Sequence, residues 1–189
     1  MDMFEYISVL TSIIIGLGIT HLLQGVAGLI QRPRRGEIYP THLVWVAYML
    51  LTTALWWWWQ FGLTIRPRWT LGIYLFVSAF ALVLYLLCAL LFPADLDGYD
   101  GYHDYFMSRR GWFFGLLALA YLLDLVDTLL KGVDYFASLG VGYPIQAGLI
   151  VVLCLVGAVT RSERYHAGLA AIAVASQLYQ GFAYLGTLG

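Results

Sequence analysis

The sequence predicts an all-helical integral membrane protein with six transmembrane helices, on the basis of composition and of the length of its apolar runs. Hydrophobic residues make up 61% of the chain and charged residues only 11%, whereas soluble domains carry about a quarter charged residues. Apolar runs of roughly 20 residues, the length of a helix that crosses a bilayer, recur along the whole chain. The runs are continuously apolar rather than alternating, which favours helices over the strands of a membrane barrel.

The apolar runs leave only short connections, so we expect one polytopic membrane domain over residues 1–189. The acidic N-terminus lacks the positive region of a signal peptide and leads into a run too long for one, which favours a membrane helix there. Prolines lie in the connections or at a first helical turn, where they are tolerated, at Pro33, Pro40, Pro67, Pro93 and Pro144. The expected spans are residues 7–30, 43–64, 70–92, 111–131, 144–160 and 167–188.

The connection before the fourth span is the most polar stretch. Tyr99, Tyr102 and Phe106 recur at helical spacing, with Arg109 and Arg110 close behind. This pattern predicts a short amphipathic helix that lies at the lipid headgroups. The same stretch holds oxygen-rich candidate ligands for Ca²⁺ or Mg²⁺, but it fails the EF-hand template, and a solvated turn is the preferred interpretation. The candidates are Asp95, Asp97, Asp100, His103 and Asp104.

Basic residues are distributed unevenly between the two sides of the expected bundle. Seven arginines fall in the first, third and fifth connections, against three basic residues on the other side. The positive-inside rule then places the odd-numbered connections in the cytoplasm and both termini outside it. The excess of Arg over Lys suggests a bacterial origin, hence an inner-membrane location. The seven are Arg32, Arg34, Arg35, Arg109, Arg110, Arg161 and Arg164, and the three are Arg66, Arg68 and Lys131.

Two acids in the fourth span are the clearest functional candidates, because an ionisable group in hydrocarbon is costly unless it is paired or hydrated. Asp124 and Asp127 share a helix face, and Lys131 follows Asp127 by four residues, the spacing of a helical ion pair. Asp124 then lies about 10 Å inside the helix end marked by Lys131. One hypothesis makes Asp124 a proton or cation site. The alternative is a structural cap in which Lys131 neutralises Asp127 and Asp124 bonds a neighbouring helix.

Polar residues in the first and sixth spans extend this hypothesis. His21 and Gln24 lie in the first span, where His21 shares a face with Gly18, Gly25 and Gly28. Gln177 and Gln180 share a face of the sixth span. Together with the acids these groups are candidates for a proton or ion pathway, provided that the first and fourth helices are neighbours. Each also fits ordinary hydrogen bonding between helices.

The second span contains four consecutive tryptophans, Trp56, Trp57, Trp58 and Trp59. Helical residues step about 100° apart, so some of these rings face lipid and others face protein. An aromatic belt at the membrane surface is the first interpretation. A slot for an apolar ligand, such as a quinone or carotenoid, or for a partner helix is the alternative.

The histidines give only a weak indication of haem. His42 and His166 lie at span ends on the same side, so they are a possible axial pair, whereas His21 lies about 10 Å deeper. The alternative is that both mark the headgroup boundary. No cofactor is identified by the sequence.

Composition and motifs argue against two classes of function. The net charge of -1 offers no basic surface for nucleic acid, and no nucleophile, phosphate-loop or zinc pattern indicates an enzyme. The first hypothesis is a proton or cation channel or transporter. The alternatives are a non-catalytic accessory subunit of a membrane complex and a protein that binds an apolar cofactor. Because so little of the chain projects into water, we also expect a homo-oligomer or a larger membrane complex.

Overall fold

The structure, a computed structural model, describes residues 3–31, 38–65 and 69–183. Every regular element within these ranges is a helix. In chain order the elements are α1 (Met3–Gln31), α2 (Pro40–Trp59), the 3-10 helix η1 (Gln60–Ile65), α3 (Leu71–Ala89), α4 (Tyr102–Lys131), α5 (Val133–Ser138), α6 (Gly142–Val159) and α7 (Glu163–Ala183).

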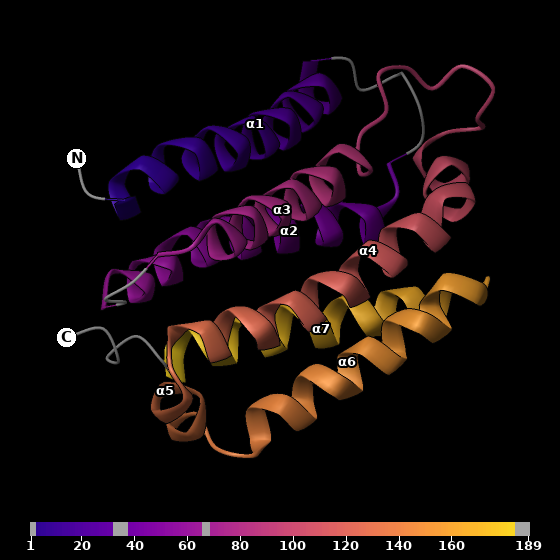
Figure 1. Cartoon of the computed structure of the whole chain (residues 1–189). Coiled ribbons are helices and arrows are strands. Elements are labelled where there is room, and N and C mark those ends of the chain that lie inside the picture. Colours follow the sequence, from indigo (N-terminus) through magenta and orange to yellow (C-terminus); the bar gives the residue numbers. More distant parts are fainter. Residues whose placement is uncertain (1–2, 32–37, 66–68, 184–189) are drawn as a thin grey trace.

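The long helices form a bundle in which successive members run in opposite directions (Figure 1). The principal neighbours are α4 with α6, α1 with α3, α2 with α7, and α3 with α4. The beginning of α1 and the end of α7 lie at the same end of the bundle, together with α5. We call this the α5 end, and the other the far end.

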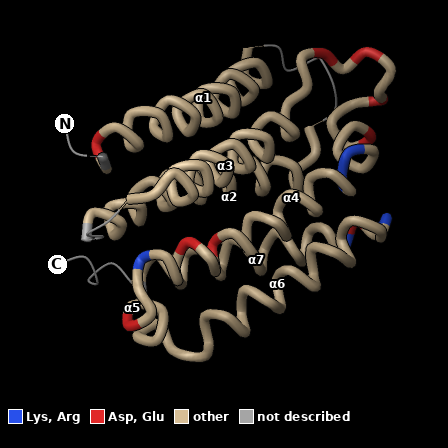
Figure 2. Tube along the Cα trace, viewed as in Figure 1, with Lys and Arg blue, Asp and Glu red and all other residues tan. Residues whose placement is uncertain are grey.

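Four of the helices, α1, α3, α4 and α6, are long and apolar enough to cross a membrane. The second and sixth expected spans are also helices, but α2 contains five Trp, three Thr and one His, and α7 carries a His and two Gln. Figure 2 shows that the charges of the described residues gather towards the two ends of the bundle, with two acids further along α4. Five of the arginines used to predict orientation lie outside the described residues, namely Arg32, Arg34, Arg35, Arg66 and Arg68.

The expectation of a separate amphipathic helix before the fourth span was wrong. Residues 93–101 form turns, and α4 then continues unbroken for 30 residues from Tyr102. Gly98 and Gly101 have φ angles of +84° and +118°, which favour glycine and make the turns that precede the helix. Phe106 is 2% exposed, and the Tyr102 ring stacks on His42 with centroids 5.1 Å apart. The aromatic face therefore packs into the bundle instead of lying on headgroups.

An aromatic layer fills the bundle between the far end and its middle. The Trp45 ring of α2 meets Phe113 and Phe114 of α4 edge to face, with centroids 5.3 and 5.4 Å apart. None of these three side chains is more than 1% exposed. Edge-to-face packing of this kind adds to the stabilisation from burial alone. The layer leaves the bundle closed at this depth.

Glycines allow α1 to approach α3 closely at two positions. A Cβ atom at Gly18 would lie 3.3 Å from Cys88 Sγ, and one at Gly25 would lie 2.2 Å from the Phe92 ring. Phe92 is only 4% exposed, so its ring has little room to move. Gly28, on the same stripe, has no such neighbour within 4 Å.

We expect Gly25→Ala to destabilise the protein and Gly28→Ala to leave it unchanged or slightly more stable. Overpacking costs about 1–3 kcal/mol, which exceeds the roughly 0.5–1 kcal/mol that alanine contributes in a helix. Thermal unfolding of both variants in the same detergent checks this prediction. Equal shifts in the two variants would contradict the close contact between Gly25 and Phe92.

Candidate functional site

Asp127 and Lys131 form a buried ion pair in the last turns of α4. Lys131 Nζ donates to Asp127 Oδ2 at 2.6 Å, and the two side chains are 7% and 0% exposed. Gln60 of η1 adds a weaker contact, since its Nε2 lies 3.3 Å from Oδ2 and 3.5 Å from Oδ1. The predicted ion pair is confirmed. Asp127 is thus neutralised by a cation on its own helix.

Asp124 has a different environment, although it lies less than one helical turn from Asp127. The Tyr143 hydroxyl of α6 donates to Asp124 Oδ2 at 2.6 Å. Thr128 Oγ1 lies 2.8 Å from the same hydroxyl, which fixes the orientation of Tyr143. Within the described ranges, no lysine or arginine forms an ion pair with Asp124. The Asp124 carboxylate therefore has a hydrogen-bond donor but no direct ion-pair partner among the described residues, although Lys131 lies close enough to act on it electrostatically.

The carboxylate of Asp124 borders two small cavities, which also share Trp59 and Gln180. The first, of about 50 Å³, extends from Asp124 towards the middle of the bundle, where Tyr48, Tyr121 and Gln177 also line it. The second, of about 30 Å³, is lined by Thr128, Lys131, Tyr135, Leu139 and Tyr143 on the side of the α5 end. Each has room for a few water molecules, which need about 10–15 Å³ apiece by this measure.

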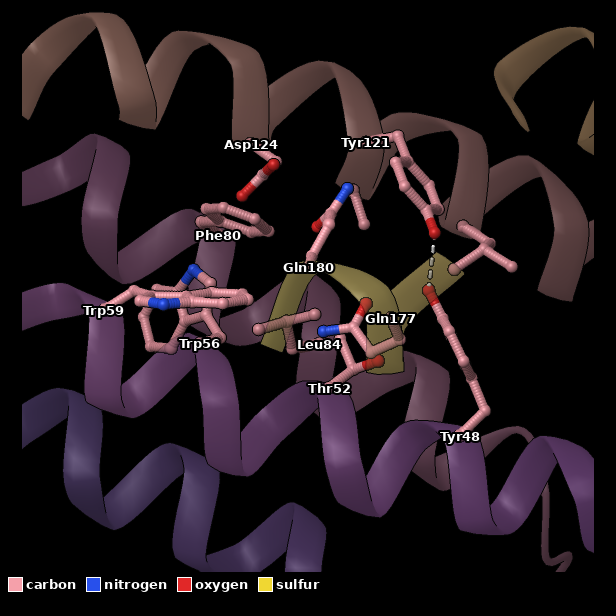
Figure 3. A pocket seen from close by; sticks show the side chains of 12 residues that line it. Tyr48, Thr52, Trp56, Trp59, Phe80, Leu84, Tyr121, Asp124, Gln177 and Gln180 are labelled. Atoms are coloured by element: carbon pink, nitrogen blue, oxygen red, sulfur yellow. Dashed lines mark hydrogen bonds between the residues drawn. The ribbon is translucent and has the colours of Figure 1, made fainter. Parts of the chain in front are cut away.

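Helices α2, α3, α4 and α7 all contribute side chains to the first cavity (Figure 3). Gln177 and Gln180 project from one face of α7, as their spacing predicted, and Asp124 points towards the cavity from α4. The Tyr48 and Tyr121 hydroxyls are hydrogen-bonded at 2.9 Å and close the inner side. Beyond them lies the aromatic layer of Trp45.

The structure brings only some of the predicted pathway residues together. Asp124, Gln177 and Gln180 line one cavity, and Asp127 lies beside them, turned towards Lys131. His21 and Gln24 instead line a separate groove at the far end, where His21 Nε2 donates to the Phe92 carbonyl at 2.9 Å. Because α1 packs on α3 and α2, its polar residues do not reach Asp124.

The four tryptophans point around α2, as the helical step predicted. Trp57 and Trp58 are 42% and 60% exposed, whereas Trp56 is 4% exposed and packs on Phe80 at a centroid distance of 5.3 Å. Trp59 borders both cavities. Two rings thus face outward, as an aromatic belt requires, and two belong to the candidate site.

The two histidines at the ends of the expected spans, His42 and His166, are hydrogen-bonded to backbone carbonyls. His42 Nε2 donates to the Leu91 carbonyl, and His166 Nε2 donates to the Thr160 carbonyl at 3.1 Å. The Phe106 ring lies between 6 and 7 Å from both imidazoles, at 6.3 and 6.1 Å. With both Nε2 atoms engaged and a phenyl ring against both imidazoles, this geometry does not fit an axial pair around a haem iron.

The acidic residues before α4 make local contacts. Asp95 accepts a hydrogen bond from the Asp97 amide, and Asp104 accepts one from the Asp100 amide. His103 Nε2 lies 2.9 Å from Glu163 Oε1 at the start of α7. Among the residues that the structure describes, no three potential ligands gather in a metal-binding group.

Sequence reasoning missed the hydroxyl partners of the site. Tyr143, Thr128 and the Tyr48–Tyr121 pair were not predicted as site residues, although each hydroxyl lies within or beside an apolar run. A buried tyrosine hydroxyl usually finds a hydrogen-bond partner. Thr128 also follows Asp124 by four residues, so it shares its face. The buried tyrosines and the spacing of Thr128 together indicate a hydrogen-bonded cluster around Asp124, but they do not identify Tyr143 of α6 as its member.

The described residues form an all-helical protein with four helices long and apolar enough to cross a membrane, and with a buried carboxylate between two cavities. No protein-family model, curated protein or solved structure matches this chain. The geometry around Asp124 is therefore the basis on which a function is assigned.

Proposed function

We propose that the protein is a six-helix transmembrane protein that moves protons or small cations, with Asp124 as the binding carboxylate. The position of Asp124 at the junction of two cavities, without a direct ion-pair partner among the described residues, is the observation that supports this proposal. Helices α2 and α7, with 20 and 21 residues, have the roughly 30 Å length that a bilayer core requires. The Arg distribution favours both termini outside the cytoplasm of a bacterial cell.

Formal charge supports binding of one cation or one proton. The cluster of Asp124, Asp127 and Lys131 contains two acids and one base, which sum to -1 when all are ionised. The charged state of Asp124 is expensive in a low-dielectric interior unless it is compensated. Lys131 is already paired with Asp127 at 2.6 Å. A proton or an incoming cation is the natural compensation for Asp124.

The closed aromatic layer favours a carrier over an open channel. The second cavity leads from Asp124 towards Lys131 and α5, whereas the first ends at the bonded hydroxyls of Tyr48 and Tyr121. Passage to the far end requires the aromatic layer to rearrange. A site that faces one side while the other is closed fits alternating access.

The cavity size favours small ions over the apolar cofactors. Pockets for drug-sized ligands typically measure about 300–1,000 Å³, and the larger cavity here measures about 50 Å³. A quinone or carotenoid would need a different arrangement of α2 and α7. Assembly into a homo-oligomer or a larger complex stays a prediction, favoured by small residues exposed along α7 at Ala167, Ala171 and Ala175.

Flux through purified protein in liposomes tests the proposal. We expect proteoliposomes to dissipate an imposed pH or cation gradient faster than protein-free liposomes, as read from a trapped pH dye or from tracer uptake. Liposomes with and without protein that stay equally tight over a range of pH and voltage would overturn it.

A further inference from the structure

Aromatic rings form much of the wall around the Asp124 carboxylate. In Figure 3, Asp124 points to the side of the cavity where the rings of Phe80, Trp56 and Trp59 lie. The planes of Trp56 and Phe80 meet at 71° with centroids 5.3 Å apart, so they make a corner. Tyr48 and Tyr121 line the opposite part of the same cavity. Ring faces attract cations that approach within about 6 Å of the centroid, and tryptophan does so most strongly.

Asp124 is the one carboxylate among the side chains that line this cavity, and it forms no ion pair within the described residues. Tyr143 hydrogen-bonds one oxygen of Asp124, and Lys131 is held by Asp127. Gln177 and Gln180 add amide groups on the α7 side. A single negative charge beside several ring faces is the arrangement that recognises ammonium groups in proteins.

The wall is poorly suited to a metal cation. Hard cations such as Ca²⁺ and Mg²⁺ require about six or more oxygen ligands. Here Leu84, Leu117 and Ala120 add only carbon to the wall, and the Tyr48 and Tyr121 hydroxyls are bonded to each other. The oxygens that remain are those of Asp124, Thr52, Gln177 and Gln180, which is fewer than such a cation requires. An ammonium ion instead donates N–H bonds to Asp124 and the glutamine carbonyls, and its methyl groups pack against the rings. The cavity volume of about 50 Å³ holds at most about three to five water-sized groups, at about 10–15 Å³ for each.

We infer that the cation held at Asp124 is a small organic ammonium ion of the methylammonium class, bound between the carboxylate and the rings of Trp56, Trp59 and Phe80. This inference rests on the proposed function of Asp124 as a cation site and adds the chemical class of the cation. Methylammonium, the smallest methylated member, fits the cavity with the fewest changes. Larger quaternary ions test the limit of its size.

Calorimetric titration of the detergent-solubilised protein with methylammonium chloride, at constant ionic strength, tests the inference. We expect saturable binding that disappears in Asp124→Asn and weakens about tenfold in Trp59→Leu, because a cation–π contact is lost. Trp58→Leu is the matched control, since Trp58 is the neighbouring ring and is 60% exposed. Trp59→Phe, which keeps a ring face, is expected to retain most of the affinity.

The outcomes separate this inference from the proposed function. Absence of methylammonium binding, together with proton or sodium flux that depends on Asp124, would overturn the inference and leave the proposed function standing. Displacement of methylammonium by equimolar sodium or potassium would also overturn it. Binding that depends on Asp124 in a protein that carries no ion across liposomes would support the ammonium site and contradict the transport function. Equal losses in Trp59→Leu and Trp58→Leu would contradict the role of the rings.

Discussion

Asp124→Asn is expected to reduce protein-mediated ion flux by more than about 100-fold while the fold is retained. Asparagine has nearly the shape of aspartate and still accepts a hydrogen bond from Tyr143, whose hydroxyl lies 2.6 Å from Asp124 Oδ2. It takes up no proton and attracts no cation. An intramembrane charge is worth several kcal/mol, and each 1.4 kcal/mol corresponds to a factor of about ten in occupancy. Flux in proteoliposomes, compared at equal protein density, measures the loss.

Two further variants make that result specific. Asp134 lies on α5, is exposed and lines neither of the two cavities, so Asp134→Asn removes an acid at the same end of the bundle and is expected to keep full flux. Asp124→Glu keeps the charge but displaces it, and partial flux is expected. Flux in Asp124→Asn close to that of the wild type would show that Asp124 is structural, as a cap bonded to α6.

Lys131→Met is expected to destabilise the protein by about 3–5 kcal/mol, since it leaves a buried charge without its partner. Asp127 is fully buried, and its remaining contact is the amide of Gln60 at 3.3 Å or more. Methionine has a similar length and no charge, so the packing of the residue 131 side chain beside Gly62 is largely kept. Unfolding in mixed micelles with increasing SDS measures the change.

The double variant Asp127→Asn with Lys131→Met separates the pair from the functional acid. Removing both charges leaves no unpaired ion, so most of the lost stability is expected to return. Because Asp124 retains Tyr143 and the lining of the first cavity is unchanged, the double variant is also expected to keep ion flux. Restored stability without flux would assign the ion pair itself to the pathway. Stability that stays low would contradict the explanation that Lys131→Met destabilises the protein by leaving Asp127 unpaired.

Local sequence patterns predicted the features that depend on neighbours along the chain. The helices begin and end within a few residues of the expected spans, except at α4, which starts at Tyr102 instead of residue 111. The Asp127–Lys131 pair was predicted because four residues return a helix to the same face. The start of α4 was missed because Phe106, at 2% exposure, is buried against His42 of α2 and His166 of α7, and these are tertiary contacts.

Some features of the Asp124 site follow from local sequence patterns, and others depend on tertiary packing. The sequence showed that Asp124 is a rare acid in an apolar span and that Gln177 and Gln180 share a face, but it left His21 as a further candidate for the same pathway. Tertiary packing separates His21 from Asp124, since α1 contacts α3 and α2 and His21 is hydrogen-bonded to the Phe92 carbonyl. Likewise, the hydrogen bond from Tyr143 depends on α6 lying against α4, which no local pattern specifies.

The sequence by itself determined the class of this protein, because hydrocarbon as a solvent selects long apolar helices that satisfy their own backbone hydrogen bonds. It also identified the polar residues whose burial in an apolar span costs enough free energy to require a structural or functional explanation. Only the tertiary structure decided which of these residues meet, and it left two cavities at Asp124 while filling the core beneath with rings. The physical reason is that partners across helices depend on side-chain fit between segments distant in the chain, and periodicity along one helix holds no information about that fit.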